Sequence, residues 1–104
     1  MKERIKITLY NKTYKEIDMS DFTEITEDIF SNRDDIVDVK LPEGVKIIDA
    51  HAFENCRHLE KIYFPATLEK IGAEAFLNCV NLCEAKVPEG VLVDATSFKG
   101  CTNL

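Results

Sequence analysis

The stretch LPEGVKIIDAHAFENC, residues 41–56, has two close copies further along the chain. Residues 64–79 read FPATLEKIGAEAFLNC, and residues 87–101 read VPEGVLVDATSFKGC. The prolines of the three copies are 23 residues apart, and each copy closes on a phenylalanine that is followed three residues later by a cysteine. A spacing that several residue types share in a chain of 104 residues predicts a repeat protein.

Four residue types hold this register and locate the repeat units. The steps are 23 and 23 residues for proline, and 23 and 22 for phenylalanine, cysteine and leucine, so the third copy is one residue shorter. A fainter copy lies 23 residues upstream of the first, as expected for a terminal repeat. The residues in register are Pro42, Pro65 and Pro88; Phe53, Phe76 and Phe98; Cys56, Cys79 and Cys101; Leu59, Leu82 and Leu104; and, in the faint copy, Ile25, Phe30, Asn32, Ile36, Val39 and Leu41.

Each unit has the pattern of a small structural layer. Residues 61–64 alternate polar and apolar side chains, which predicts a short half-buried strand that Pro65 ends. Residues 68–72 are a second short apolar segment closed by glycine, and residues 73–79 are predicted to form one or two helical turns. One such unit is too small to bury its apolar side, so the units are predicted to stack into a solenoid.

Residues 41–82 resemble the BspA-like leucine-rich repeats, whose unit is similar to L-x-x-I-x-[IF]-P-x-x-[VL]-x-x-I-G-x-x-A-F-x-x-C. Residues 59–79 match nearly every position of this unit. The first unit departs from it at Asp49, where the family prefers glycine, and the third departs at Asp94 and Ser97 and in its length.

The resemblance covers residues 36–104 strongly and residues 18–35 weakly, and residues 1–17 lie outside it. It implies protein recognition or adhesion and no chemical reaction. Extracellular members of the family would need an export signal.

The N-terminal segment has a pattern of its own. Residues 5–9 and 14–19 are predicted to be two strands of a β-hairpin that turns at residues 11–12, and a helix is expected to follow. Hairpin and helix would cover the first strand of the stack, which otherwise presents unpaired backbone groups to water. The residues that predict the helix are Ser20 as N-cap and Phe22, Ile25 and Ile29 at helical spacing.

The predicted fold class is a β-rich (α+β) repeat solenoid, a short stack of leucine-rich repeats with an N-terminal hairpin and helix cap. It is expected to form a single domain over residues 1–104. Residues 1–35 would supply the cap and the degenerate repeat, and the units would be residues 36–58, 59–81 and 82–104.

The C-terminal side of the stack is predicted to be uncapped. Leu104 aligns with Leu59 and Leu82, each of which begins a strand, but no strand follows Leu104. We expect this edge to be covered by self-association into a homo-oligomer, by a partner, or by sequence outside these 104 residues.

Charge is concentrated in one part of the sequence. The chain has a net charge of −6, and residues 16–38 alone hold nine acidic residues against one arginine. This excludes direct binding of a nucleic-acid backbone there, whereas a basic partner fits; a solvated acidic face is the simpler interpretation. The residues of this acidic patch are Glu16, Asp18, Asp21, Glu24, Glu27, Asp28, Asp34 and Asp35, followed by Asp38.

The sequence shows no signal of export or membrane insertion. No apolar run approaches the ~20 residues that span a bilayer, and residues 1–12 lack the apolar core of a signal peptide. We therefore expect a cytoplasmic protein, or an extracellular one if a leader has been removed.

Residues with reactive side chains are explained better by packing than by chemistry. The three cysteines in register are spaced by the repeat length rather than by the short C-x₂₋₄-C spacing of zinc sites, so we expect them in the core. Cys83 lies outside the register, and His51 and His58 do not recur in the second unit, so these are expected at the surface. With no phosphate loop, nucleophile elbow or H-E-x-x-H motif, we expect no enzyme, no metal and no cofactor.

The strand pattern predicts a binding face. The inward residues are expected to be Ile36, Val39, Leu41, Ile62, Phe64, Ala85 and Val87. A tyrosine between lysines on the opposite face is typical of a protein contact, although a plain solvated strand face has the same pattern. The candidate partner-binding residues are Asp38, Lys40, Lys61, Tyr63, Glu84 and Lys86.

The sequence thus favours a non-catalytic protein–protein interaction module whose partner is a protein. One alternative is a small acidic intracellular inhibitor that mimics nucleic acid through residues 16–38. Another is a fragment of a secreted cell-surface adhesin.

Overall fold

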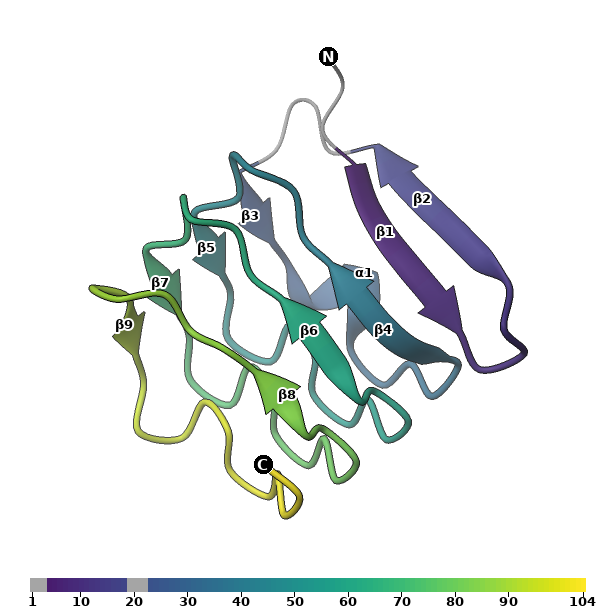
Figure 1. Ribbon diagram of the computed structural model, residues 1–104. Coiled ribbons are helices and arrows are strands. Elements are labelled where there is room, and N and C mark those ends of the chain that lie inside the picture. The colour runs from purple at the N-terminus through teal and green to yellow at the C-terminus, as the bar shows by residue number, and fades with distance from the viewer. Residues whose placement is uncertain (1–3, 19–22) are drawn as a thin grey trace.

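The computed structural model, shown in Figure 1, describes residues 4–18 and 23–104. These residues are rich in strands and contain only one short helix, and no helix among them is long and apolar enough to cross a membrane. The elements are β1 (Arg4–Leu9), β2 (Tyr14–Asp18), β3 (Glu24–Ile25), α1 (Glu27–Phe30), β4 (Ile36–Lys40), β5 (Ile47–Ile48), β6 (Lys61–Tyr63), β7 (Lys70–Ile71), β8 (Glu84–Ala85) and β9 (Leu92–Val93).

The strands form two separate sheets, and each sheet gains strands in step with the repeats along the sequence (Figure 1). One sheet has the order β2-β1-β4-β6-β8, and the other has the order β3-β5-β7-β9. Within each sheet the repeated strands are parallel, and paired residues such as Val39 and Ile62 are one repeat length apart. Each repeat therefore adds one strand to each sheet.

The predicted hairpin is present and continues the five-stranded sheet. Strands β1 and β2 pair antiparallel, and β1 also pairs antiparallel with β4. Ile5 and Ile7 of β1 are buried in the common core, and Ile7 lies opposite Val39. The free side of β4 is thus taken by β1.

The predicted N-terminal helix is wrong in position. Ile25 was expected on that helix but lies in β3, paired with Ile48 of β5. The helix of the structure, α1, begins only at Glu27 and is four residues long. Ile25 holds the same repeat position as Ile48, and the parallel ladder satisfies its backbone better than an isolated helical turn would. The expected N-cap Ser20 and Phe22 lie outside the described residues.

The helical turns expected at residues 73–79 are replaced by successive four-residue turns. Their N–H groups bond to the carbonyl three residues back, as from Cys79 to Phe76 at 3.1 Å, or reach sideways to the next repeat, as from Phe76 to Ser97 at 2.7 Å. Glu74 and Asn78 have positive φ angles of 55° and 60°, which an α-helix does not allow. Lateral bonding between repeats therefore takes the place of bonding within a helix.

The core is a column of identical residues, as the repeat pattern predicts. The ring centroids of Phe30, Phe53, Phe76 and Phe98 follow one another at 4.8, 4.9 and 5.0 Å, with the planes nearly parallel. Beside them, the thiols of the cysteine column donate to phenylalanine carbonyls of the preceding repeat, as from Cys79 to Phe53 at 3.1 Å. The inward strand positions also follow the prediction: Ile36, Val39, Leu41 and Ile62 are buried, and Phe64, Ala85 and Val87 pack half-buried against this core.

Candidate functional site

The outer face of the five-stranded sheet gathers the residues that the sequence predicts to bind a partner. Register places Asp38, Lys61 and Glu84 side by side in one row across β4, β6 and β8. A second row begins with Lys40 of β4 beside Tyr63 of β6. Lys86, just after β8, lines the same hollow as Tyr63 and Glu84.

Two shallow hollows meet at Tyr63. One has a volume of about 330 Å³ and lies over β1, β2, β4 and β6, with Tyr14 and Tyr63 among its lining residues. The other has a volume of about 280 Å³ and is lined by Ile62, Tyr63, Phe64, Glu84 and Lys86. Tyr63 is 43% exposed and Tyr14 is 81% exposed, so both rings are available to a partner.

The hairpin contributes half of this surface, which the sequence analysis did not foresee. Lys6 lies opposite Lys40, and Thr8 lies opposite Asp38, in the antiparallel ladder between β1 and β4. The signal was available, because Lys6 and Thr8 alternate with the buried residues of β1 and must face outward. The missing step was the pairing of β1 with β4. The hairpin residues that line the 330 Å³ hollow are Lys6, Ile7, Thr8, Tyr14, Lys15 and Glu16.

The centre of this face carries positive charge that the described residues leave unneutralised. No ion pair is formed by Lys6 or Lys40 within residues 4–18 and 23–104. Glu16, opposite Lys6 in the ladder, is bound instead to Arg4 at 3.2 Å. Like charges directly opposite each other in a sheet are destabilising, so an added carboxylate at this point would be favoured.

Asp38 introduces a negative charge next to the lysines. Partial burial raises the pKa of the Asp38 carboxyl above its usual range. The nearby charge of Lys61 lowers this pKa, but its effect is smaller than that of burial. Glu60 and Glu84 raise the pKa of Asp38 further. The face thus has a positive row and a mixed row in which Lys61 separates two acids.

The acidic patch is divided between the two sheets. Glu16 and Asp18 lie on β2, whereas Glu24 lies on β3 of the other sheet. Asp35 is held by Arg33 at 2.6 Å, and this contact lowers the pKa of the Asp35 carboxyl. The others are Glu27 and Asp28 in the first turn of α1, Asp34 before β4, and Asp21, which lies outside the described residues.

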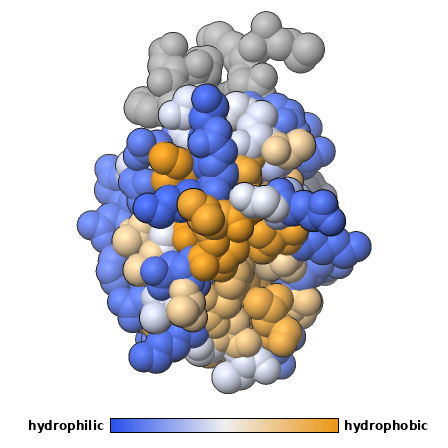
Figure 2. All heavy atoms as spheres, turned by 90° about the vertical axis from the view of Figure 1, so that its left-hand side faces the viewer, coloured by the Kyte–Doolittle hydropathy of each residue, from blue (hydrophilic) through white to orange (hydrophobic). Residues whose placement is uncertain are grey.

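A third and larger hollow, of about 480 Å³, lies on the four-stranded sheet. Ile47, Lys70 and Leu92 are adjacent in its ladder, and Leu92 is 72% exposed. Figure 2 views the molecule from the side of β9 and shows an apolar area in the middle of this face with hydrophilic residues around it. The sequence analysis did not predict this surface, although two adjacent apolar residues at 92 and 93 in a two-residue strand were a signal for it.

Cysteines and histidines do not converge on one point in the structure. Cys83 is exposed, as expected, and its thiol lies 3.4 Å from the carbonyl of Glu60. Hydrogen bonds with the neighbouring cysteines, together with burial, raise the pKa of the Cys79 thiol, which makes it a poor ligand and nucleophile. Within the described part of the chain, no group of three or more His, Cys, Asp or Glu side chains is placed to hold a metal ion.

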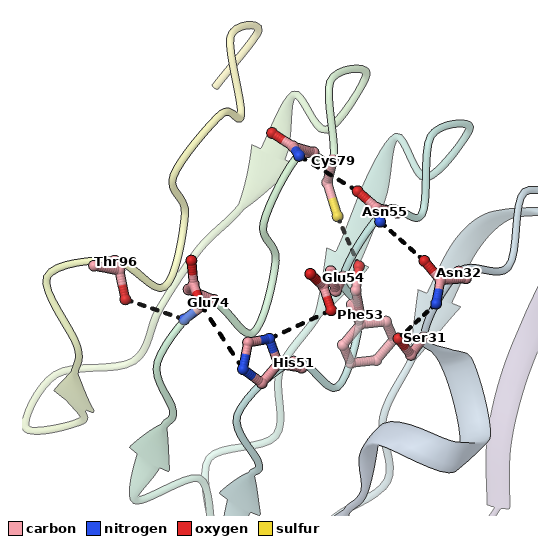
Figure 3. Close-up of polar contacts among 10 residues, drawn as sticks. Ser31, Asn32, His51, Phe53, Glu54, Asn55, Glu74, Cys79 and Thr96 are labelled. Atoms are coloured by element: carbon pink, nitrogen blue, oxygen red, sulfur yellow. Dashed lines mark hydrogen bonds and ion pairs between the residues drawn. The ribbon is translucent and has the colours of Figure 1, made fainter.

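The two histidines have structural contacts. The His51 side chain is 36% exposed and lies between two glutamates (Figure 3), with Nδ1 3.3 Å from Oε2 of Glu54 and Nε2 3.8 Å from Oε1 of Glu74. His58 lies elsewhere, with Nδ1 2.7 Å from the carbonyl of Asp34 and its ring beside Tyr10. His51 therefore links two successive repeats.

An asparagine column links the repeats in the same way, and it was not recognised in full from the sequence. Nδ2 of Asn55 donates to Oδ1 of Asn32 at 2.9 Å (Figure 3). Nδ2 of Asn78 in turn donates to Oδ1 of Asn55 at 3.4 Å. All three have φ near +60°, a conformation that favours asparagine and glycine. Gly100 follows in register with φ +81°, and a Cβ atom there would lie 2.4 Å from Oδ1 of Asn78.

Comparison with known proteins agrees with this repeat architecture. A model of the BspA type leucine rich repeat region (6 copies) matches residues 5–104. The match includes the hairpin, which the sequence analysis placed outside the resemblance. No curated protein and no solved structure gives a match. Since the family model covers nearly the whole sequence, the chain belongs to the BspA-type leucine-rich repeat family.

Proposed function

We propose that this chain is a non-catalytic protein-binding module and that its partner contacts the outer face of the five-stranded sheet. The observation that carries this proposal is the 330 Å³ hollow in which two exposed tyrosines lie beside Lys6 and Lys40, neither of which forms an ion pair with another described residue. Leucine-rich repeats generally bind other proteins, which is the coarser statement that the family supports.

The proposal includes the architecture that presents this face. We propose a single domain in the form of a short solenoid, with repeat units at residues 36–58, 59–81 and 82–104. Residues 1–35 act as its N-terminal cap together with the degenerate repeat. The antiparallel pairing of β1 with β4 supports this role, because it covers the first repeated strand.

Tyr63 has the features of an interface anchor. Its neighbour Ile62 is buried, so the strand that carries the ring is fixed to the core. An aromatic ring held on a rigid strand loses little conformational entropy on binding, and charged residues around it form the polar rim of typical interfaces. The expected partner surface offers an apolar contact for Tyr63 and carboxylates for Lys6 and Lys40.

The acidic patch is not proposed as the binding surface, because its residues are divided between the two sheets and two of them already pair with arginines. A mimic of nucleic acid needs its carboxylates in one continuous row along a surface. No observation favours a secreted adhesin over other protein-binding roles.

The test compares two exposed tyrosines. A partner captured on the immobilised protein is identified by mass spectrometry, purified, and titrated against wild type, Tyr63→Ala and Tyr10→Ala. Tyr10 is 65% exposed but lines neither hollow of the proposed face, so it serves as the matched control. Tyr63→Ala is expected to weaken binding by about tenfold or more, and Tyr10→Ala to leave it unchanged.

Charge-reversal variants give a second test of the same face. Lys6→Glu with Lys40→Glu should abolish binding of the same partner, and raised salt should weaken wild-type binding. If the partner binds both tyrosine variants and the double lysine variant as it binds wild type, this face is not its binding site.

A further inference from the structure

The five-stranded sheet has two edge strands of different character. The edge strand β2 carries Lys15, Glu16 and Asp18, and charges along an edge discourage pairing with another chain. The edge strand β8 consists of Glu84 and the half-buried Ala85 and is followed by Lys86. Although β8 also carries charge, the unpaired backbone groups of an edge strand are a template on which a further strand can pair where the opposing charges are complementary.

The backbone of β8 is oriented for such pairing. The N–H of Glu84 bonds to the carbonyl of Glu60, which lies on the side of β6. Successive residues of a strand direct their backbone groups to opposite sides, so the N–H and C=O of Ala85 point to the free edge. Ala85 can therefore exchange two hydrogen bonds with one residue of an antiparallel strand.

We propose that two copies of this chain associate through β8, with the strands antiparallel and Ala85 opposite Ala85 of the second copy. In this register, Glu84 lies opposite Lys86 of the second copy, and Lys86 lies opposite its Glu84. Both side chains line the same hollow on the outer face, so each cross-strand pair joins opposite charges on one side of the sheet. The sequence Glu-Ala-Lys is thus complementary to itself, and this identifies a second copy as the occupant of the edge.

The apolar surface beside this edge favours the same contact. Leu92 and Val93 of β9, in the same repeat as β8, are 72% and 42% exposed. Phe98 stacks on Phe76 at 5.0 Å, and no other ring of the described residues stacks on its far side. Apolar area of this kind is typically buried in a contact between proteins.

The geometry selects a two-fold dimer rather than a chain of copies. A head-to-tail contact would pair β8 of one copy with β2, the other edge strand, of the next, and the charges along β2 discourage such pairing. In an isologous contact, both copies use the same β8 surface. No free β8 edge then remains, so the assembly stops at two copies. It would join two five-stranded sheets into one sheet of ten strands. The two β6 strands would lie three strand spacings, about 14 Å, apart, with both copies of Tyr63 on a common face.

Charge reversal at the edge tests the register directly. Sedimentation velocity of the 104-residue protein from about 1 to about 100 µM is expected to show a monomer–dimer equilibrium. Glu84→Lys and Lys86→Glu should each raise the dimer dissociation constant about tenfold, because each places two pairs of like charges in the contact. The double variant, with both charges exchanged, should restore the wild-type constant.

Mixing supplies an internal control. An equimolar mixture of Glu84→Lys and Lys86→Glu should form a heterodimer, because every cross-strand pair in it again joins opposite charges. Lys15→Glu, on the far edge of the same sheet, changes the net charge equally and should leave dimerisation unchanged. Circular dichroism checks that each variant is folded.

A wild-type chain that stays monomeric over this range would overturn the proposal. The proposed register would be wrong if the single variants had the dimer dissociation constant of wild type. It would also be wrong if the double variant dimerised no more tightly than either single variant. These outcomes are separate from the partner titrations above, because they involve only this chain.

Discussion

The phenylalanine column makes a quantitative prediction about stability that depends on position. Phe76 is fully buried and has three aromatic neighbours: Phe53 at 4.9 Å, Phe98 at 5.0 Å, and Phe64 edge-on at 6.0 Å. Phe98 is only partly buried, and among residues 4–18 and 23–104 its one aromatic neighbour is Phe76. The same substitution at the two sites should therefore have different costs.

The magnitude follows from burial and ring contacts. Removing a fully buried phenylalanine ring leaves a cavity and costs about 3–5 kcal/mol, and Phe76→Ala should fall in the upper half of this range because three ring contacts are lost with it. Phe98→Ala removes a partly exposed ring with one ring contact, so we expect about 1–2 kcal/mol. Against a total stability of about 5–15 kcal/mol, the first change would leave little stability at the lower end of this range, whereas the second would leave most of it.

Urea denaturation followed by circular dichroism measures the difference. With a slope of about 1.5 kcal/mol/M, a loss of 4 kcal/mol lowers the midpoint by about 2.7 M, and a loss of 1.5 kcal/mol lowers it by about 1 M. Phe76→Leu, which keeps an apolar side chain but no ring, should lie between Phe76→Ala and wild type. If Phe76→Ala and Phe98→Ala differ by less than about 0.5 kcal/mol, ring stacking within the column does not contribute as inferred.

Three further predictions concern polar groups. Ser97→Ala should change the free energy of unfolding by less than about 1 kcal/mol, because the two carbonyls that accept from its hydroxyl also accept from backbone N–H groups; a larger loss in urea denaturation would contradict this. In the folded protein, a thiol reagent should label the exposed Cys83 quickly and the buried Cys79 only at the rate of unfolding, as mass spectrometry of labelled peptides can show; rapid labelling of Cys79 would refute its burial. The Arg33 contact lowers the pKa of Asp35, so it contributes stability above the unfolded pKa that is lost as pH falls through the folded pKa. Asp35→Asn should therefore lower the melting temperature at about pH 7 but not at about pH 2, and an equal effect at both pH values would argue against it.

The repeat explains why so much of the fold could be predicted. Phe53, Phe76 and Cys79 recur in register, and identical residues at one spacing must lie in one column, so the core followed directly from the sequence. Contacts that cross the repeat boundary were predicted less well. Ile25 was assigned to a helix because its local spacing fits one, whereas its parallel pairing with Ile48 decides its structure.

The candidate site was predicted in part for a related reason. The outward positions of β4, β6 and β8 follow from alternation, so Asp38 and Tyr63 could be placed on one face. The contribution of Lys6 and Tyr14 depends on the antiparallel pairing of β1 with β4, which joins residues about 30 positions apart and has no periodic signal. For the same reason, the like-charged pair of Lys6 and Lys40 appears only in the folded structure.

The chemistry of stacking determines which positions repeat and which vary. Identity is favourable in the core column because rings stack on rings, and in the asparagine column because each amide both donates and accepts. On the outer face, identical charges in adjacent strands about 4.8 Å apart would repel, and the row of Asp38, Lys61 and Glu84 alternates in sign instead. Along this row, variation between repeats is therefore favoured by the same register that favours identity in the core. A row whose charges differ from strand to strand offers a pattern that can distinguish one partner from another, which is a physical reason to expect binding specificity on this face.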